Sequence, residues 1–288
     1  MVIVTLFACA PQLLSPSLDV RTLDGLAELP ADATVVGGGE LAVLFRHPLA
    51  VEFGVADVFD EQLMAAGFDV RTDQLDRALV GCGTGGCVGV VDGDLSLAPD
   101  RPRLREYTTS TVGDTFFLKA QRGPGLRVRV GARRARVADA PAWEASGFDA
   151  DTLIGAIPDG DAFVYVHDAS RFLRQAAARA TSEGTAGSRK AAGRAERLVP
   201  AAESAGLRAI AVSLDVSRDS SSQLRVRYAA ESIAAAIFWQ AVIEEQGVVL
   251  SGVAEDVWAR GSWVRVGETV EFTLDATAAE LRAIRNGE

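Results

Sequence analysis

The sequence predicts an α+β protein that contains two diverged repeats of a ferredoxin-like β-α-β-β-α-β unit with antiparallel sheets. Short β-prone runs alternate with Ala-, Leu- and Arg-rich helical stretches along the chain. A proline turn that leads into a β-prone run occurs at residues 29–36 and again, 128 residues later, at 157–164. The length of 288 residues suits two such units, because a chain of this size can bury two cores.

The repeats define the expected segments of the chain. A second, weaker match joins residues 76–80 to residues 207–211, and a strand follows in both places. Asp139-Ala140-Pro141 marks a boundary between the halves. We therefore expect a signal or lipobox remnant with a tether over 1–17, a first α+β repeat over 18–138, a connecting helical segment over 139–156 and a second α+β repeat over 157–288.

The second half shows the order of its elements most clearly. Short β-prone runs predict strands at 162–166 and 224–228 and a closing hairpin formed by 263–266 and 270–274, and alternating apolar and small or polar residues predict a strand at 207–216. Helical spacing predicts helices at 168–181, 231–246 and 277–285. The middle helix carries Trp239 as a predicted core residue, and the apolar residues Ile233, Ile237, Phe238, Ala241 and Val242.

The first half follows a similar plan and ends in a β-rich, arginine-rich stretch. Strands are expected at 115–120 and 126–130. Residues 24–99 hold 13 acidic and 3 basic side chains, whereas residues 101–136 hold 10 basic and 2 acidic ones. The alternation in 126–130 places Arg127 and Arg129 on one face of a strand.

These arginines form a candidate anion-binding set, since guanidinium groups on a sheet face suit carboxylates and phosphates. The partner would be an anionic glycan, a lipid headgroup or an envelope protein. The alternatives are a solvated outer face and neutralisation by the acidic stretch. The net charge of −10 argues against a nucleic-acid partner. The set consists of Arg127, Arg129, Arg133, Arg134 and Arg136.

The N-terminus resembles a bacterial lipobox. Apolar residues precede Cys9, and Leu6-Phe7-Ala8-Cys9 places a small residue directly before this cysteine. The resemblance implies a signal peptide, lipidation of Cys9 and a membrane partner through the lipid anchor. The location would be extracytoplasmic, with the lipoprotein facing the periplasm or the surface of the outer membrane. A buried strand with an ordinary core cysteine is the alternative.

Cys82 and Cys87 lie between two strand-like runs, with four residues between them. A tight hairpin would bring the thiols within bridging distance, so we predict a disulfide, which suits an oxidising compartment. Free thiols are one alternative. A zinc site is another, but C-x4-C departs from the usual spacing, and His47 and His167 lie in different halves.

The layout also resembles tandem-repeat α+β envelope lipoproteins of GC-rich, myxobacterium-like bacteria. The resemblance rests on the Leu29-Pro30-Ala31-Asp32 turn, its repetition and a basic set that is almost entirely arginine. It extends in layout over residues 26–285. It assigns no activity to any residue. We expect a non-catalytic binding or interaction module of the cell envelope.

No catalytic residue, cofactor or metal is predicted. Residues 81–86 match G-x-G-x-x-G, but a strand-like run follows where the dinucleotide fingerprint requires a helix. The chain contains no G-x-S-x-G elbow. An extracytoplasmic hydrolase is the alternative function, and it would need His47 or His167 within hydrogen-bond reach of a nucleophile.

Overall fold

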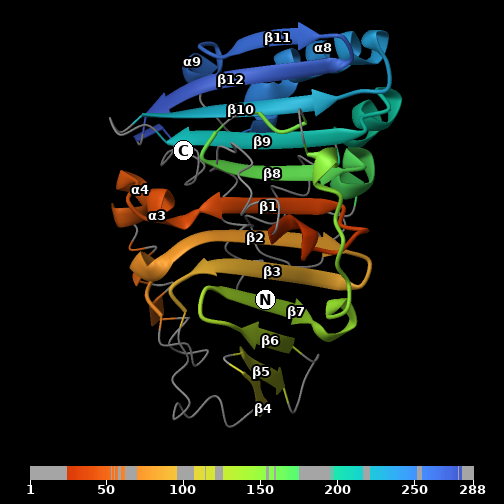
Figure 1. Ribbon diagram of the computed structural model, residues 1–288. Coiled ribbons are helices and arrows are strands. Elements are labelled where there is room, and N and C mark those ends of the chain that lie inside the picture. The colour runs from red at the N-terminus through yellow and green to blue at the C-terminus, as the bar shows by residue number, and fades with distance from the viewer. Residues whose placement is uncertain are drawn as a thin grey trace.

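The strands of the described chain form one antiparallel sheet. The computed structural model describes residues 25–95, 107–120, 126–174, 196–216 and 221–280, except 53, 55, 58–59, 62–69, 114, 154–155, 159, 197, 252–254 and 278. The sheet has twelve strands in the order β11-β12-β10-β9-β8-β1-β2-β3-β7-β6-β5-β4 (Figure 1). With the helices that flank the sheet, this confirms the α+β class.

The bounds of the elements are as follows. The strands are β1 (Val35–Glu40), β2 (Leu75–Gly83), β3 (Gly86–Gly93), β4 (Tyr107–Val112), β5 (Thr115–Ala120), β6 (Leu126–Val130), β7 (Arg134–Asp139), β8 (Ala162–His167), β9 (Ala209–Val216), β10 (Ser221–Ala229), β11 (Ser262–Val266) and β12 (Thr269–Thr277). The helices are α3 (Leu41–Leu44), α4 (Pro48–Glu52), α8 (Ile233–Ser251) and α9 (Glu255–Trp258). Single 3-10 turns are η1 (Thr72–Gln74), η3 (Ala140–Ala142) and η4 (Ala150–Thr152).

The first strands of the two predicted repeats are neighbours at the centre of the sheet. β1 and β8 pair antiparallel, with Val35 opposite Val166. From this pair the sheet extends outward through β2 and β3 on one side and through β9 and β10 on the other. The ferredoxin-like layout is not confirmed, because β8 and β9 are direct antiparallel neighbours, whereas a split β-α-β unit inserts another strand between them.

The predicted elements of the second half are present with shifted ends. β8, β9, β10, α8 and the β11–β12 hairpin occupy the expected places. The helix expected at 168–181 is helical over its described residues 169–174. Of the helix expected at 277–285, residue 277 belongs to β12, and residues 279 and 280 are helical. The connecting segment 139–156 contains the short turns η3 and η4 within its described residues. Residues 1–17, with Cys9, lie outside the described chain.

Two different kinds of cover lie on the two faces of the sheet. One face, which we call the strap face, packs beneath residues 25–33 and beneath the strap, defined as residues 140–157. Leu79, Val90 and Phe163 of the sheet meet Leu29 and Phe148 of these segments in the largest buried cluster. Backbone hydrogen bonds from residues 147 and 148 to the carbonyls of residues 27 and 29 join the two covering segments.

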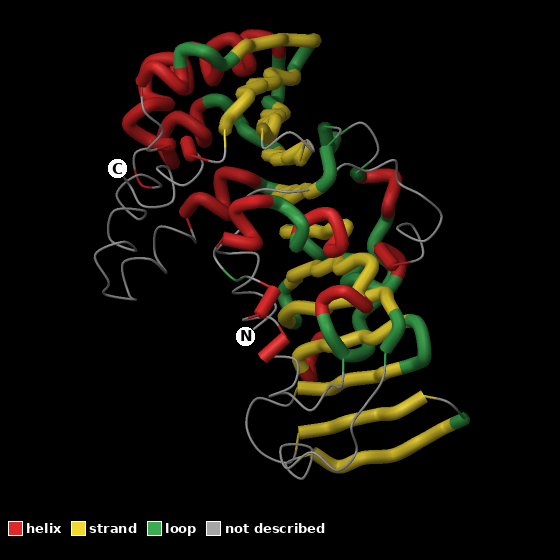
Figure 2. The backbone as a smooth tube through the Cα atoms, turned by 90° about the vertical axis from the view of Figure 1, so that its left-hand side faces the viewer, coloured by secondary structure: helices red, strands yellow, loops and turns green. Residues whose placement is uncertain are grey.

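The opposite face, called the helix face, carries α3 in the first half and α8 and α9 in the second (Figure 2). Trp239 of α8 is fully buried and packs against Tyr228, with ring centroids 5.7 Å apart, which confirms its predicted core position. Trp258 and Trp263 pack on the buried ring of Phe272. These aromatic residues therefore stabilise the β11–β12 end of the sheet.

Candidate functional site

The arginine-rich strands β6 and β7 place their charged side chains on the strap face. Val128 and Val130 of β6 are buried on the helix face with Leu118 of β5. Because side chains alternate along a strand, Arg127 and Arg129 point to the strap face, as the sequence predicts. The alternation of side chains along β6 is enough to place these two guanidinium groups on the strap face.

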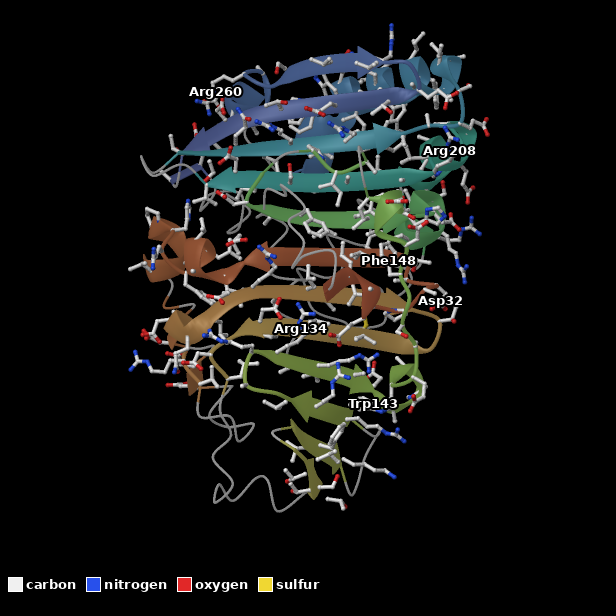
Figure 3. The ribbon with its side chains drawn as sticks, in the orientation of Figure 1. Asp32, Arg134, Trp143, Phe148, Arg208 and Arg260 are labelled. Carbon is white, nitrogen blue, oxygen red and sulfur yellow. A yellow bond between two sulfur atoms is a disulfide. The ribbon has the colours of Figure 1, made fainter. Side chains whose placement is uncertain are left out.

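The register of the strands brings further side chains beside Arg129. Arg129 pairs with Arg136 of β7 on one side and with Phe117 of β5 on the other. The strap then passes over these strands and contributes Trp143 (Figure 3). The result is an open pocket of about 440 Å³, which we call the arginine–tryptophan pocket. It is lined by Ala27, Glu28, Phe117, Arg129, Arg136, Trp143, Glu144 and Ser146.

Arg136 forms the floor of this pocket and is 5% exposed. Its Nη1 donates to the carbonyl of Trp143 at 2.6 Å, and its Nη2 donates to the carbonyl of Ala145 at 2.7 Å. Nη2 also donates to the carbonyl of Glu28 at 3.4 Å. Burial lowers the pKa of the Arg136 guanidinium, and the neighbouring Arg129 lowers it further. Arg136 therefore holds the strap to the sheet.

Glu28 is the internal counter-ion of the arginine set. Its carboxylate accepts from Arg129 Nη2 at 2.6 Å and from Arg134 Nη1 at 3.3 Å, and Arg136 Nε lies 3.8 Å away. Arg134 also donates to both carboxylate oxygens of Asp92, at 2.5 and 2.9 Å (Figure 3). The hydrogen bond to Asp92 raises the pKa of Arg134. These contacts agree with the alternative interpretation of the arginines, in which the acidic stretch of residues 24–99 neutralises their charge.

Trp143 lies close to two guanidinium groups. The Arg136 Cζ is 5.2 Å from the centre of the indole ring, and the Arg127 Cζ is 5.9 Å from it. Both distances are in the range of cation–π attraction. The Nε of Arg127 is buried and makes no hydrogen bond in the described chain. Arg127 contacts the tryptophan of the pocket, and its Nη1 lies 3.8 Å from the carboxylate of Glu144.

The structure thus separates the five predicted arginines into three groups. Arg129 and Arg136 line the pocket, and Arg127 stands beside its tryptophan. Arg134 is bound to Asp92 and Glu28, and Arg133 is exposed. Their role in anion binding stays a prediction. Sequence reasoning missed Glu28, Phe117, Trp143, Glu144 and Ser146, although the excess of acidic residues in 24–99 was a signal for Glu28.

The predicted cysteine pair lies at the turn of the β2–β3 hairpin. Cys82 and Cys87 face each other across the β2–β3 hairpin, with Cα atoms 4.1 Å apart and Sγ atoms at a bonding distance of 2.11 Å. Asp32 accepts a hydrogen bond from the backbone N–H of Thr84 in the turn at 3.0 Å. Asp139 accepts one from the backbone N–H of Cys87 at 2.9 Å. These two carboxylates hold the hairpin end that carries the sulfur atoms.

The two histidines lie in separate places. His47, between α3 and α4, has its Nε2 3.1 Å from the Oγ of Ser222 on β10. Both residues are buried, at 5% and 1% exposure. His167 has its Nδ1 3.3 Å from the hydroxyl of Tyr165. Ser170 donates its hydroxyl to the carbonyl of Leu207 at 3.3 Å. The His47–Ser222 pair therefore links segments from the two halves of the chain.

No protein-family model, curated protein or solved structure matches this chain. No helix in the described part of the chain has the length and apolar character that a membrane crossing requires. Among the same residues, no group of three or more His, Cys, Asp or Glu side chains is placed to hold a metal ion. The geometry of the arginine–tryptophan pocket is thus the main guide to function.

Proposed function

We propose that this chain is a non-catalytic binding module of the bacterial cell envelope, anchored by a lipid on Cys9, and that its arginine–tryptophan pocket takes a glycan with a carboxylated sugar. One observation carries the proposal: two aromatic walls, Phe117 and Trp143, flank the guanidinium groups of Arg129 and Arg136 in a single open pocket. Pockets of this kind combine apolar area with a few polar groups that orient a ligand.

The polar groups of the pocket suit a sugar better than a polyanion. Arg129 supplies donors, Glu28 and Glu144 supply acceptors, and Ser146 can do both. The two positive and two negative charges balance, so a multiply charged phosphate would meet repulsion from the glutamates. A single carboxylate can bind the Arg129 side chain, which is 41% exposed. A sugar ring can then lie against Trp143.

The envelope location and the repeat origin remain parts of the proposal. The lipobox-like residues 6–9 and the bonded pair Cys82–Cys87 support an oxidising, extracytoplasmic location. The strand register supports a duplication. Gly39 pairs with Ala78 in the first half. When the offsets of the two sequence matches are continued along the chain, these residues correspond to His167 and Ala209, which pair in the second half. We therefore propose two diverged repeats that join through β1 and β8.

A hydrolase is the second candidate, and the 3.1 Å distance between His47 Nε2 and Ser222 Oγ favours it. A serine nucleophile beside a histidine base is the usual start of such a site. Here both side chains are closed to solvent, so a substrate could reach them only after a local rearrangement of the fold. Covalent labelling of Ser222 by a fluorophosphonate would establish this candidate; an unlabelled Ser222 would support the binding module.

Calorimetric titration tests the binding function. The probes are a hexuronate trisaccharide, its neutral methyl ester and vesicles of phosphatidylglycerol. We expect the acidic trisaccharide to bind, and Arg129→Ala to weaken it at least about tenfold, since a charge-assisted hydrogen bond contributes about 1.5 kcal/mol or more. Arg133→Ala is the matched control, because Arg133 is exposed and does not line the pocket.

Three outcomes would contradict the ligand class: equal affinity for the ester, binding to the vesicles alone, or equal losses in the two arginine variants. The anchor has a separate test. Mass spectrometry of the native protein should find a diacylglyceryl group on Cys9, and an unmodified Cys9 would refute the anchor without touching the pocket.

A further inference from the structure

Helix α8 is apolar on both its inner and its outer side. Its inner side packs into the helix-face core through Ala235, Ala236, Trp239 and Ile243. Its outer side exposes Ile233, Ile237 and Phe238, at 56%, 48% and 44%. A helix on the surface of a globular protein normally carries polar residues on the side away from the core. The outer side of α8 is therefore unusual.

The exposed residues form one continuous stripe. At 100° per residue, positions 233, 234, 237, 238 and 241 fall on the side opposite the buried residues. All five are exposed and apolar, with Ala234 and Ala241 between the large side chains. The stripe, which we call the α8 stripe, spans residues 233–241, about two and a half helical turns. Contiguous exposed apolar areas of this kind mark sites of interaction.

The same side of the helix changes character in the next turn. Glu244 and Glu245 follow the stripe on the outer side and are both exposed. Glu231, also exposed, stands just before the helix begins. The sequence of α8 contains no lysine or arginine. An apolar stripe followed by two carboxylates is complementary to an apolar surface followed by positive charge.

This charge pattern selects among the classes of partner. Two copies of the chain that met through their α8 stripes would bring acidic ends close to one another, which costs free energy. A bilayer with anionic lipids would repel the same carboxylates. An amphipathic helix with apolar residues at i, i+3, i+4 and i+7, followed by lysine or arginine, satisfies both parts of the surface.

We propose that the α8 stripe docks an amphipathic, basic-ended helix of a partner protein, whose cations meet Glu244 and Glu245. This surface lies at the β11–β12 end of the sheet, whereas the arginine–tryptophan pocket lies over β6 and β7 near the opposite end (Figure 1). The docking surface is therefore independent of the proposed glycan site.

Fluorescence anisotropy with two synthetic helical peptides tests the proposal. Both peptides carry leucine at i, i+3, i+4 and i+7; one ends in two lysines and the other in two glutamates. We expect the lysine peptide to bind the wild-type chain at least about tenfold more tightly. The variant Ile237→Ser with Phe238→Ser should lose that binding, and Glu244→Lys with Glu245→Lys should reverse the preference between peptides.

The matched control is Val264→Ser, which removes an equally exposed apolar side chain (57%) from β11 without touching α8. It should bind the lysine peptide as the wild type does. Binding of neither peptide, equal binding of both, or a preference that the charge reversal leaves unchanged would overturn the proposal. The proposal would also be overturned if the wild-type chain self-associated in sedimentation, or bound phosphatidylcholine vesicles, and Ile237→Ser abolished that association.

Discussion

Replacing Arg136 by alanine removes the guanidinium that ties the strap to the sheet. Two short hydrogen bonds are lost, to the carbonyls of Trp143 and Ala145, at 2.6 and 2.7 Å. A hydrogen bond from a charged donor contributes about 1.5–3 kcal/mol, so the pair contributes about 3–6 kcal/mol. Trp143 and Ala145 are only half-buried, and water recovers part of this. We therefore expect Arg136→Ala to lower the free energy of unfolding by about 3–4 kcal/mol.

Urea unfolding followed by circular dichroism measures this loss. A change of this size moves the midpoint by about 1 M or more, since the urea dependence for small proteins is about 1–3 kcal/mol per M. Arg136→Met separates the lost hydrogen bonds from the lost packing of the aliphatic stem, and should remain destabilised. The control Arg133→Ala should stay within about 0.5 kcal/mol of the wild type. If Arg136→Ala also stayed within that limit, the strap would be held by something other than Arg136.

Three further perturbations have defined outcomes. Burial lowers the pKa of His47, so the unfolded chain binds a proton at higher pH than the folded chain, and stability falls as the pH drops below about 6.5. In urea titrations at pH 7.5 and 5.5, His47→Gln should show a smaller loss of stability between the two pH values than the wild type. An equal loss in both proteins would refute the assignment of this pH dependence to His47. Reduction of Cys82–Cys87 should cost about 2 kcal/mol by the same assay, whereas an unshifted midpoint would mean that the pair adds no stability. A Cβ on Gly261 would lie 2.1 Å from the buried ring of Phe272, so Gly261→Ala should lower the melting temperature. The control Gly85→Ala should leave the melting temperature unchanged, because its Cβ meets nothing closer than 3.6 Å.

Local patterns predicted the elements that local chemistry determines. The alternation in 126–130 correctly placed Arg127 and Arg129 on one face, because side chains alternate along any strand. The glycine-rich turn between Cys82 and Cys87 correctly indicated a hairpin with the sulfur atoms face to face. Helical spacing located α8 and its buried Trp239.

Tertiary contacts determine what the sequence did not predict. The order of the strands depends on pairing over long separations, so the single antiparallel sheet could not be distinguished from ferredoxin-like units by local patterns. The arginine–tryptophan pocket needs Glu28 and Trp143, which approach β6 and β7 only because the two covering segments are hydrogen-bonded together. The sequence also could not predict that Ile237 points away from the core, because α8 is apolar on both sides.

The indole N–H signals of a ¹⁵N-labelled sample test the glycan site most directly. The chain has 4 tryptophans, and only Trp143 lines the pocket, while Trp239 is buried in α8 on the helix face. Titration with the hexuronate trisaccharide should shift the Trp143 signal, assigned through Trp143→Phe, and leave that of Trp239 in place. An unmoved Trp143 signal at saturating trisaccharide would contradict the arginine–tryptophan pocket as the binding site.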